Sequence, residues 1–288
     1  MQDRARIAVV TDSTSDIPRS LVESTGIQMM PQVLIMGNRT WRDGVDIDPP
    51  TFYELLRTSS AFPSSSQASM QDFYDLFRRV GREYEGIVAI VVSSKLSGTI
   101  NSAQAAAAEI RDLPIEVIDS RAASMQLGFI ALAAARTAAT GAGLEAVAAM
   151  ARKVIEQVRI YFVVDTLEYL HRGGRIGLAA RLFGTALNLK PVLTVTDGVV
   201  TPVARIRSRR KALDHLYSLL DEDLAGADPE RVHMAVLHVA APREGAELAA
   251  RVEARFHPGE MIVGDCGPVV GAHVGPGTMG MAYYVEGA

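Results

Sequence analysis

The chain has 288 residues, of which 48% are hydrophobic and 22% charged, so it has enough apolar material for one large domain or two ordinary ones. This composition excludes disorder as the main state. The formal net charge of -4 argues against a protein whose affinity comes mainly from neutralising nucleic-acid phosphates. The single cysteine, Cys266, excludes an intramolecular disulfide, and no Cys/His grouping has zinc-finger spacing.

The chain contains no long apolar run of the kind that crosses a membrane. The longest purely aliphatic stretch, Ile87 to Val92, is far shorter than a bilayer requires. The first residues lead straight into a strand-like segment rather than into the core of a secretory signal. We therefore expect a cytoplasmic protein without stable membrane insertion.

The first half of the chain alternates short apolar runs with helical patterns, which is typical of a parallel sheet covered on both faces. Its extended segments are Ile7 to Val10, Ile27 to Ile35, Ile87 to Val92 and Ile115 to Ile118. Its helical patterns are Pro18 to Gly26, Gln71 to Glu83, Ile100 to Ile110, Ala122 to Ala139 and Leu144 to Val158. The pattern predicts an N-terminal three-layer α/β/α domain over residues 1–159.

The pattern changes after Arg159 and predicts antiparallel pairing. Asp197-Gly198 separates two apolar runs, and this dipeptide accepts the positive φ angles of a hairpin turn. The expected strands are Tyr161 to Val164, Val192 to Thr196, Val199 to Val203, Met234 to Val239, Met261 to Gly264 and Met281 to Val285. The expected helices are a short one before Gly173-Gly174, then Ile176 to Leu187, Lys211 to Leu224 and Arg243 to Phe256. We predict an α/β protein whose second domain, residues 160–288, is α+β with a mainly antiparallel sheet.

Three segments of the first half are rich in hydroxyl side chains and precede or contain helix starts. They are Thr11 to Thr14, Ser64 to Gln67, and Ser93 to Thr99. Hydroxyls and free backbone N–H groups at helix starts form a neutral cradle for an oxyanion. Capping of the helices is the alternative, which for Thr11 to Thr14 is the stronger one. In the third segment the density of donors and the close approach that Gly98 permits favour a ligand site.

A fourth segment, His273 to Gly280, contains the pattern G-x-G-x-x-G. Too few residues follow it to form a βαβ unit, so the pattern fails the context that dinucleotide binding requires. His273 beside this turn is a candidate because a histidine donates to an oxyanion near neutral pH. A structural hydrogen bond is the alternative for a lone histidine.

Basic residues cluster at two places in the second half, around Arg175 and in the segment Arg205 to Lys211. On an acidic protein such clusters suit a phosphate or an acidic partner, although the outermost charges fit a solvated helix face equally well. The chain lacks a G-x-x-x-x-G-K-[ST] phosphate loop, a G-x-S-x-G elbow and an H-E-x-x-H motif. The usual machinery for ATP binding or ester hydrolysis is therefore missing.

Together the segments resemble the DegV family, whose members in some bacteria are the fatty-acid-binding subunits of fatty acid kinase. The matching pieces are Val10 to Thr14, Pro63 to Gln67, Ser93 to Thr99, Val164 to Ile176, Leu187 to Leu193 and His273 to Gly280. Each of these motifs is weak evidence alone, but six of them in the right order are a specific sign of the family. The resemblance implies two domains with a fatty acid buried between them and a partner kinase that phosphorylates its carboxylate.

The resemblance also implies roles for single residues. The family pattern Thr-Ser-Gln-Pro falls on Ser65 to Ala68, where Ser65 keeps the hydroxyl and Ala68 replaces the proline. The Leu-Ser-Gly-Thr pattern is intact, so Ser97 and the Gly98 N–H match the second carboxylate-binding element, and His273 matches the family histidine. Two arginines match basic positions suited to kinase docking or to a phosphorylated ligand, Arg175 and Arg207.

We therefore expect a monomeric carrier of a long-chain fatty acid such as palmitate, stearate or oleate, with no catalytic residue, metal or cofactor of its own. Its expected partner is the catalytic subunit of a fatty acid kinase. One alternative is a serine hydrolase or acyltransferase that uses Ser97 with His273, although no acidic group to orient the histidine can be identified. Another is a DNA-binding regulator that uses Arg205 to Lys211, which the acidic total charge disfavours.

Overall fold

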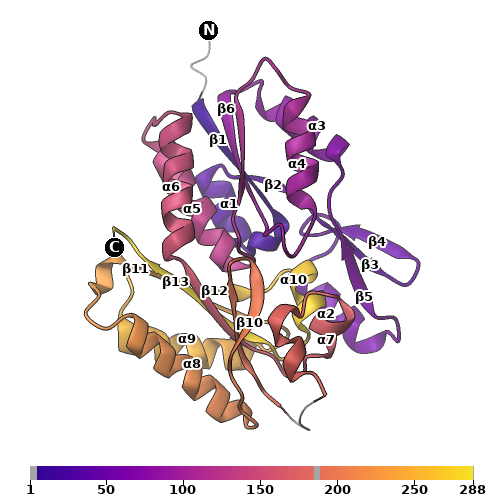
Figure 1. Cartoon of the computed structure of the whole chain (residues 1–288), viewed down its shortest axis with the longest axis vertical. Coiled ribbons are helices and arrows are strands. Elements are labelled where there is room, and N and C mark those ends of the chain that lie inside the picture. Colours follow the sequence, from indigo (N-terminus) through magenta and orange to yellow (C-terminus); the bar gives the residue numbers. More distant parts are fainter. Residues whose placement is uncertain (1–4, 185–188, 288) are drawn as a thin grey trace.

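The computed structural model describes residues 5–184 and 189–287, and it contains three β-sheets. Figure 1 shows a half built on a parallel sheet and a half built on a six-stranded sheet, one above the other, with a small three-stranded sheet at their side. Within the described residues no helix is long and apolar enough to cross a membrane. The α/β fold class is confirmed, with one sheet that the sequence did not predict.

The first sheet has four parallel strands in the order β2-β1-β6-β7. Alternate residues of β1 face opposite layers, because side chains of a strand alternate in direction: Ala8 and Val10 pack in one core with α3 and α4, whereas Ile7 and Val9 pack in another with α5 and α6. This is the predicted three-layer arrangement. The strands are β1 (Ala5–Asp12), β2 (Gln28–Met30), β6 (Tyr84–Val91) and β7 (Ile115–Asp119). The helices are α1 (Arg19–Thr25), α3 (Met70–Val80), α4 (Thr99–Ala108), α5 (Met125–Ala139) and α6 (Leu144–Gln157), with the 3-10 turn η1 (Ser13–Ser15).

The second sheet has the strand order β10-β9-β8-β13-β11-β12 and is antiparallel except for the pair β11 and β12. The predicted hairpin is present, with φ of 50° at Asp197 and 78° at Gly198. One face of the sheet is covered by α8 and α9, and the other faces the parallel-sheet half. The strands are β8 (Arg159–Val163), β9 (Val192–Thr196), β10 (Val199–Ala204), β11 (Val232–His238), β12 (Glu260–Asp265) and β13 (Met279–Val285). The helices are α7 (Glu168–Arg172), η2 (Gly177–Leu182), α8 (Arg209–Asp223), η3 (Pro229–Arg231), α9 (Pro242–Phe256) and α10 (Pro268–Val274).

The third sheet corrects two expectations. The extended pattern expected over Ile27 to Ile35 is divided between β2 and β3, which belong to different sheets. The serine-rich segment expected as a loop forms the strand β5, which pairs antiparallel with β3. The strands are β3 (Val33–Met36), β4 (Arg39–Arg42) and β5 (Pro63–Ser66), and the helix α2 (Pro49–Thr58) lies between the last two in the chain.

Two further expectations differ from the structure or stay open. The helix expected over Ile176 to Leu187 is the 3-10 helix η2, and residues 185–187 lie outside the described residues. The first strand of the six-stranded sheet begins at Arg159, where the domain boundary is expected. The division at 159/160 stays a prediction, because α5 packs into one hydrophobic core with side chains of both large sheets.

Candidate functional site

A cavity of about 280 Å³ lies between the carboxyl edge of the parallel sheet and the inner face of the six-stranded sheet. A single water needs only about 10–15 Å³ of such space, so the cavity suits a much larger molecule. Most of its wall is apolar. The apolar lining comprises Val92, Leu96, Ala123, Ile160, Phe162, Leu170, Val195, Val200, Leu237, Val269, Val270, Val274 and Ala282.

Polar side chains gather on the part of the wall that β5, the loop before α4 and α10 supply. Ser65 Oγ lies 2.7 Å from His273 Nε2, so a strand of the N-terminal half meets a helix of the C-terminal half at the cavity. His273 Nδ1 is buried without a partner among the described residues, and an added Cβ on Gly173 would lie 2.3 Å from it. Burial, with the nearby Arg175 charge, lowers the pKa of His273 to about 4, so its imidazole is neutral at pH 7.

The two nitrogens of His273 therefore have different surroundings, which bears on its tautomer. A buried N–H without an acceptor is more costly than a bare ring nitrogen, so the proton belongs on Nε2. Nε2 then donates to Ser65 Oγ, and the Ser65 hydroxyl proton is left for a group in the cavity. This arrangement suits an acceptor such as a carboxylate.

The turn between β6 and α4 supplies the second hydroxyl. Ser97 Oγ lies 2.8 Å from Thr99 Oγ1 and also accepts the Thr99 backbone N–H at 3.3 Å. Thr99 is fully buried, whereas Ser97 is partly exposed and lines the cavity. Two serines distant in the sequence, Ser65 and Ser97, thus lie on the wall of one cavity.

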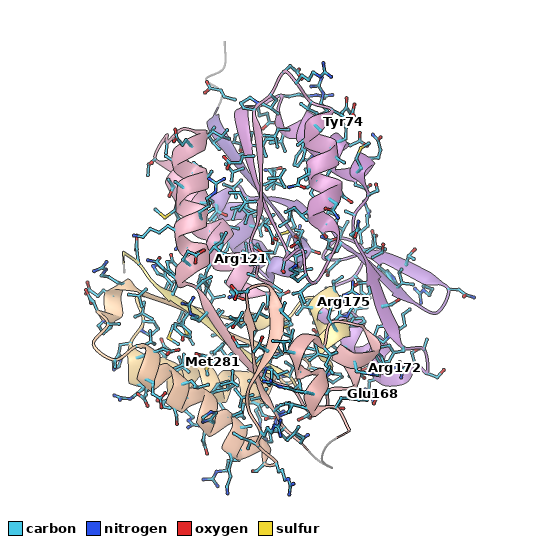
Figure 2. The ribbon with its side chains drawn as sticks, viewed as in Figure 1. Tyr74, Arg121, Glu168, Arg172, Arg175 and Met281 are labelled. Carbon is cyan, nitrogen blue, oxygen red and sulfur yellow. The ribbon has the colours of Figure 1, made fainter. Side chains whose placement is uncertain are left out.

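Arg175 also lines the cavity and brings a positive charge to it. Its Nε donates to the Leu96 carbonyl at 3.0 Å and its Nη1 to the Gly173 carbonyl at 2.7 Å. No carboxylate among the described residues forms an ion pair with it. Figure 2 shows Arg175 where the two halves of the molecule meet. The hydrogen-bond donors on the cavity wall therefore include the neutral hydroxyls of Ser65 and Ser97 and the positively charged Arg175, which is itself bound to backbone carbonyls.

The remaining predicted site residues are placed differently. Gly98 is the N-cap residue of α4 and touches Gln67, whose Oε1 would lie 2.3 Å from an added Cβ. A side chain at position 98 would therefore displace Gln67, which lines the cavity. Arg207 does not line the cavity. It is exposed in a separate basic hollow at the start of α8 with Arg205 and Lys211.

Three buried carboxyl groups lie behind the cavity, where β1 ends and α10 begins. Asp12 accepts the Val92 N–H at 2.8 Å, and burial raises its pKa. Asp16 accepts from Ser124 Oγ at 2.6 Å and from the Gly267 N–H at 2.9 Å, and burial raises its pKa to about 7. The Asp16–Gly267 hydrogen bond attaches the segment before α10 to the parallel-sheet half, whereas Asp12 joins the end of β1 to the residue after β6.

Asp43 completes this attachment from the loop after β4. It accepts from Ser13 Oγ at 2.8 Å and from the Val269 N–H, and burial raises its pKa to about 7. Tyr53 of α2 adds a hydrogen bond of 2.6 Å from its hydroxyl to the Cys266 carbonyl. The start of α10 is therefore fixed by residues that the sequence places more than 200 positions earlier.

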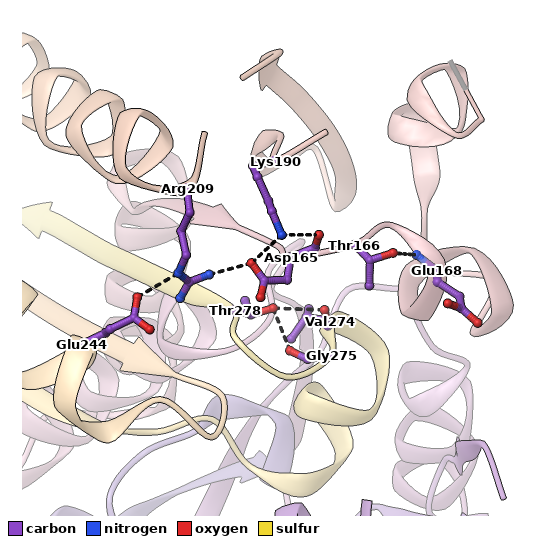
Figure 3. Close-up of polar contacts among 9 residues, drawn as sticks. All are labelled: Asp165, Thr166, Glu168, Lys190, Arg209, Glu244, Val274, Gly275 and Thr278. Carbon is purple, nitrogen blue, oxygen red and sulfur yellow. Dashed lines mark hydrogen bonds and ion pairs between the residues drawn. The ribbon is translucent and has the colours of Figure 1, made fainter. Parts of the chain in front are cut away.

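A cluster of charged side chains lies near the C-terminal end of α10, as Figure 3 shows. Asp165 accepts from Lys190 Nζ at 2.9 Å and from Arg209 Nη1 at 2.8 Å, and Arg209 also donates to Glu244. An added Cβ on Gly277 would lie 2.5 Å from Asp165, so the glycine-rich turn packs on this cluster. Thr278 Oγ1 closes the helix end by donating to the carbonyls of the last turn.

Sequence reasoning missed Gln32, which is 2% exposed and lines the cavity. Its amide connects two segments of the polar wall, because Oε1 accepts the Ala68 N–H just after β5 and Nε2 donates to Thr99 Oγ1 at the start of α4. No motif indicates it, because its partners are far away in the sequence. The hydrolase alternative finds no support in the geometry, since His273 pairs with Ser65 rather than with Ser97, and its Nδ1 has no acidic partner in residues 5–184 and 189–287.

Comparison with known proteins identifies close relatives of the whole chain. Residues 6–286 match the family model described as "Uncharacterised protein, DegV family". A DegV domain-containing protein of Streptomyces coelicolor is 38% identical over 278 residues, which are 96% of this chain and 97% of that protein.

Two solved structures share the fold over nearly their full lengths. A DegV family protein from Thermus thermophilus, described by its fatty acid binding, superposes with a TM-score of 0.91 at 35% identity and covers 97% of this chain and 99% of its own. DegV of Bacillus subtilis, described as a fatty acid binding protein, has a TM-score of 0.91 at 33% identity. The match covers 98% of this chain and 99% of the Bacillus chain.

Proposed function

The chain belongs to the DegV family, and from this membership and the geometry of the cavity we propose that it is a carrier of long-chain fatty acids. The acyl chain lies in the apolar cavity between the two large sheets, and the carboxylate lies at Ser65, Ser97, Gly98 and His273. The observation that carries the proposal is one largely apolar cavity whose wall includes the polar side chains of Ser65, Ser97 and His273. The fatty acid binding described for the Thermus and Bacillus relatives supports it.

The acyl chain supplies most of the binding free energy. Burying about fifteen methylenes at ~0.8 kcal/mol each gives roughly 12 kcal/mol before the costs of ordering and association are subtracted. The side chains of Ile160, Phe162 and Val195 on the inner face of the six-stranded sheet provide the apolar contact. A chain such as palmitate, stearate or oleate is the expected ligand.

The carboxylate needs hydrogen-bond donors, because a buried anion without partners costs several kcal/mol. The hydroxyl protons of Ser65 and Ser97 and the backbone N–H of Gly98 are the donors in this proposal. The neutral His273 directs the Ser65 proton toward the ligand, and the Arg175 charge favours the ionised form of the acid. In the part of the chain that the structure describes, Arg175 is held by the Leu96 and Gly173 carbonyls rather than by a carboxylate, so the ligand need not displace an ion pair there.

We propose further that the carrier has no turnover of its own and acts as a cytoplasmic monomer. It presents the bound carboxylate to a separate ATP-dependent fatty acid kinase, which forms the acyl phosphate. The exposed hollow of Arg207, Arg205 and Lys211 supports a docking role, because its charge suits an acidic partner surface or a phosphorylated ligand. In a reaction with that kinase, Arg207→Ala is expected to lower acyl phosphate formation and to leave palmitate affinity unchanged.

The test of the carrier function begins with the protein as purified from bacteria. Mass spectrometry of an organic extract should find a long-chain fatty acid, and the delipidated protein should take up labelled palmitate. Ser97→Ala removes one charge-assisted hydrogen bond and is expected to weaken palmitate binding by about 10- to 100-fold. Ser94→Ala is the matched control, since Ser94 is exposed in the same turn and does not line the cavity. A protein that carries no acid and takes up no palmitate would refute the proposal.

A further inference from the structure

Gln32 lies between β2 and β3 and connects the segment that follows β5 to the start of α4 at the polar wall of the cavity. Its backbone is fixed on both sides, because its N–H donates to Ser13 Oγ at 3.0 Å and its carbonyl accepts the Asp43 N–H at 2.9 Å. Its side chain is 2% exposed and lines the cavity. The amide is therefore held in one place and points to the polar end of the site.

The orientation of the Gln32 amide follows from its partners. Gln32 Oε1 accepts the backbone N–H of Ala68 at 2.9 Å, and Nε2 donates to Thr99 Oγ1 at 3.1 Å. A backbone N–H can only donate, so the oxygen of the amide must face Ala68 and the two ends cannot be exchanged. Thr99 Oγ1 is consequently an acceptor of this bond.

The direction of the next hydrogen bond follows from the donation by Gln32 together with burial. Gln32 Nε2 donates to Thr99 Oγ1, so the Thr99 proton cannot point toward Gln32. Thr99 is 0% exposed, and the acceptor within reach of its hydroxyl proton, among the described residues, is Ser97 Oγ at 2.8 Å. A buried hydroxyl proton without an acceptor costs free energy, so Thr99 turns away from Gln32 and donates to Ser97. Ser97 Oγ accepts the Thr99 N–H as well, which leaves its own proton for the cavity.

We propose that Gln32 is a positioning residue that sets the direction of this chain of hydrogen bonds and so presents the Ser97 proton to an acceptor in the cavity. The chain runs from Gln32 to Thr99 to Ser97 and then to the ligand. It makes the site prefer a carboxylate, which only accepts, over a hydroxyl head group, which also donates. This inference rests on the proposed carrier function and names a residue and a selectivity that the function alone does not require.

The experiment compares two probes with the same sixteen-carbon tail, palmitate and hexadecanol. The delipidated full-length chain is titrated with each, and the ratio of the two affinities is the readout. Gln32→Met keeps the size of the side chain but removes its hydrogen bonds to Ala68 and Thr99, together with its hydrogen bond to Asp12. We expect the ratio of palmitate to hexadecanol affinity to fall at least about fivefold, because the Ser97 proton is no longer directed into the cavity. A merely structural role for Gln32 would lower both affinities equally and leave the ratio unchanged, which would overturn the proposal.

Thr99→Val supplies a second and independent test, including the case in which Gln32→Met does not fold. Valine neither donates to nor accepts from Ser97, so the Ser97 proton stays available and the ratio should remain within about twofold of the original chain. If Ser97 instead donates to Thr99, the substitution releases that proton and the ratio rises several-fold, which would contradict the proposed direction.

The double variant measures the coupling between the two residues. Gln32→Met should have no further effect on the ratio in the Thr99→Val background, because the group that Gln32 directs is gone. An equal fall of the ratio in both backgrounds would contradict the proposal. Failure of the unaltered chain to bind palmitate would instead refute the carrier function, so the two failures are distinguishable.

Discussion

The side chains at the polar end of the cavity were predictable to different degrees. Ser65, Ser97 and His273 belong to contiguous motifs that a sequence displays directly, and the structure places all three on one cavity wall. Gln32 belongs to no motif, and its importance comes from partners 36 and 67 positions away. Arg207 was expected from the resemblance to serve kinase docking or a phosphorylated ligand, and its place in a basic hollow away from the cavity could not be read from the sequence.

Acidification provides a test of the environment of His273. The folded pKa of about 4 lies below the ordinary value of 6.5, so the unfolded chain takes up the proton first as the pH falls. The stability of the folded state is therefore full above pH 6.5 and is lost progressively between 6.5 and 4. At pH 5 the loss through His273 is roughly 2 kcal/mol relative to pH 7.

The His273→Gln variant cannot take up this proton, so its unfolding free energy should fall less than that of the original chain between pH 7 and pH 5. Urea unfolding at the two pH values measures the difference. His257→Asn is the control, because His257 is exposed at the end of α9. An identical pH dependence in His273→Gln and the original chain would show that His273 is not held neutral by burial.

At the scale of elements, strands with strong periodicity were predictable and strands formed by pairing were not. β6 contains a continuous apolar run from Ile87, and the hairpin of β9 and β10 contains an Asp-Gly turn, so both were predicted. β5 has the sequence Pro-Ser-Ser-Ser and becomes a strand because it pairs with β3. The extended conformation of β5 is determined by its partner β3 rather than by its own residues, and for this reason the sequence did not predict the third sheet.

The attachment of α10 to the parallel-sheet half depends on protonated carboxyl groups and can be tested at Asp43. Its folded pKa of about 7 lies above the ordinary 3.8, so the folded chain keeps a proton that the unfolded chain releases. Stability through Asp43 is therefore highest at low pH and falls as the pH rises from about 4 to 7.

Asp43→Asn cannot ionise and retains an oxygen that accepts from Ser13. Between pH 5 and pH 8 the variant should gain on the order of 2 kcal/mol of unfolding free energy relative to the original chain. Chemical denaturation across this range measures the gain. Asp46→Asn is the control, because the Asp46 carboxylate is at the surface with a pKa of about 2. A constant difference between Asp43→Asn and the original chain would mean that Asp43 is ionised throughout.

At the scale of the whole molecule, the cavity exists because the two halves approach each other from opposite sides. The hairpin turn of the six-stranded sheet reaches the edge of the parallel sheet, where Ser93 Oγ donates to the Gly198 carbonyl at 2.9 Å. An added Cβ on Gly198 would lie 2.3 Å from that Ser93 oxygen, so the approach requires glycine there. Periodicity predicts each half separately, whereas the space left between them depends on side chains more than 100 positions apart.

A ligand that fills this space should stabilise the molecule as a whole. At a free concentration 100 times Kd a ligand that binds only the folded chain adds about 2.7 kcal/mol. For a chain of this size that corresponds to a rise in Tm of roughly 5–10 °C when palmitate is added to the delipidated protein.

Gly280 on β13 lines the cavity, and an added Cβ there would meet Phe162 Cβ at 3.5 Å, an ordinary contact. The position therefore accepts a side chain that occupies the space of the acyl chain.

Gly280→Leu is expected to retain the Tm of the delipidated protein within a few degrees and to lose most of the palmitate-induced rise. Gly264→Leu is the matched control, since Gly264 lies in strand β12, has room for a Cβ and does not line the cavity. Differential scanning calorimetry with and without palmitate measures both shifts. A full palmitate-induced rise in Gly280→Leu would mean that the acyl chain does not lie along the inner face of the six-stranded sheet, because a leucine there and the chain would require the same volume.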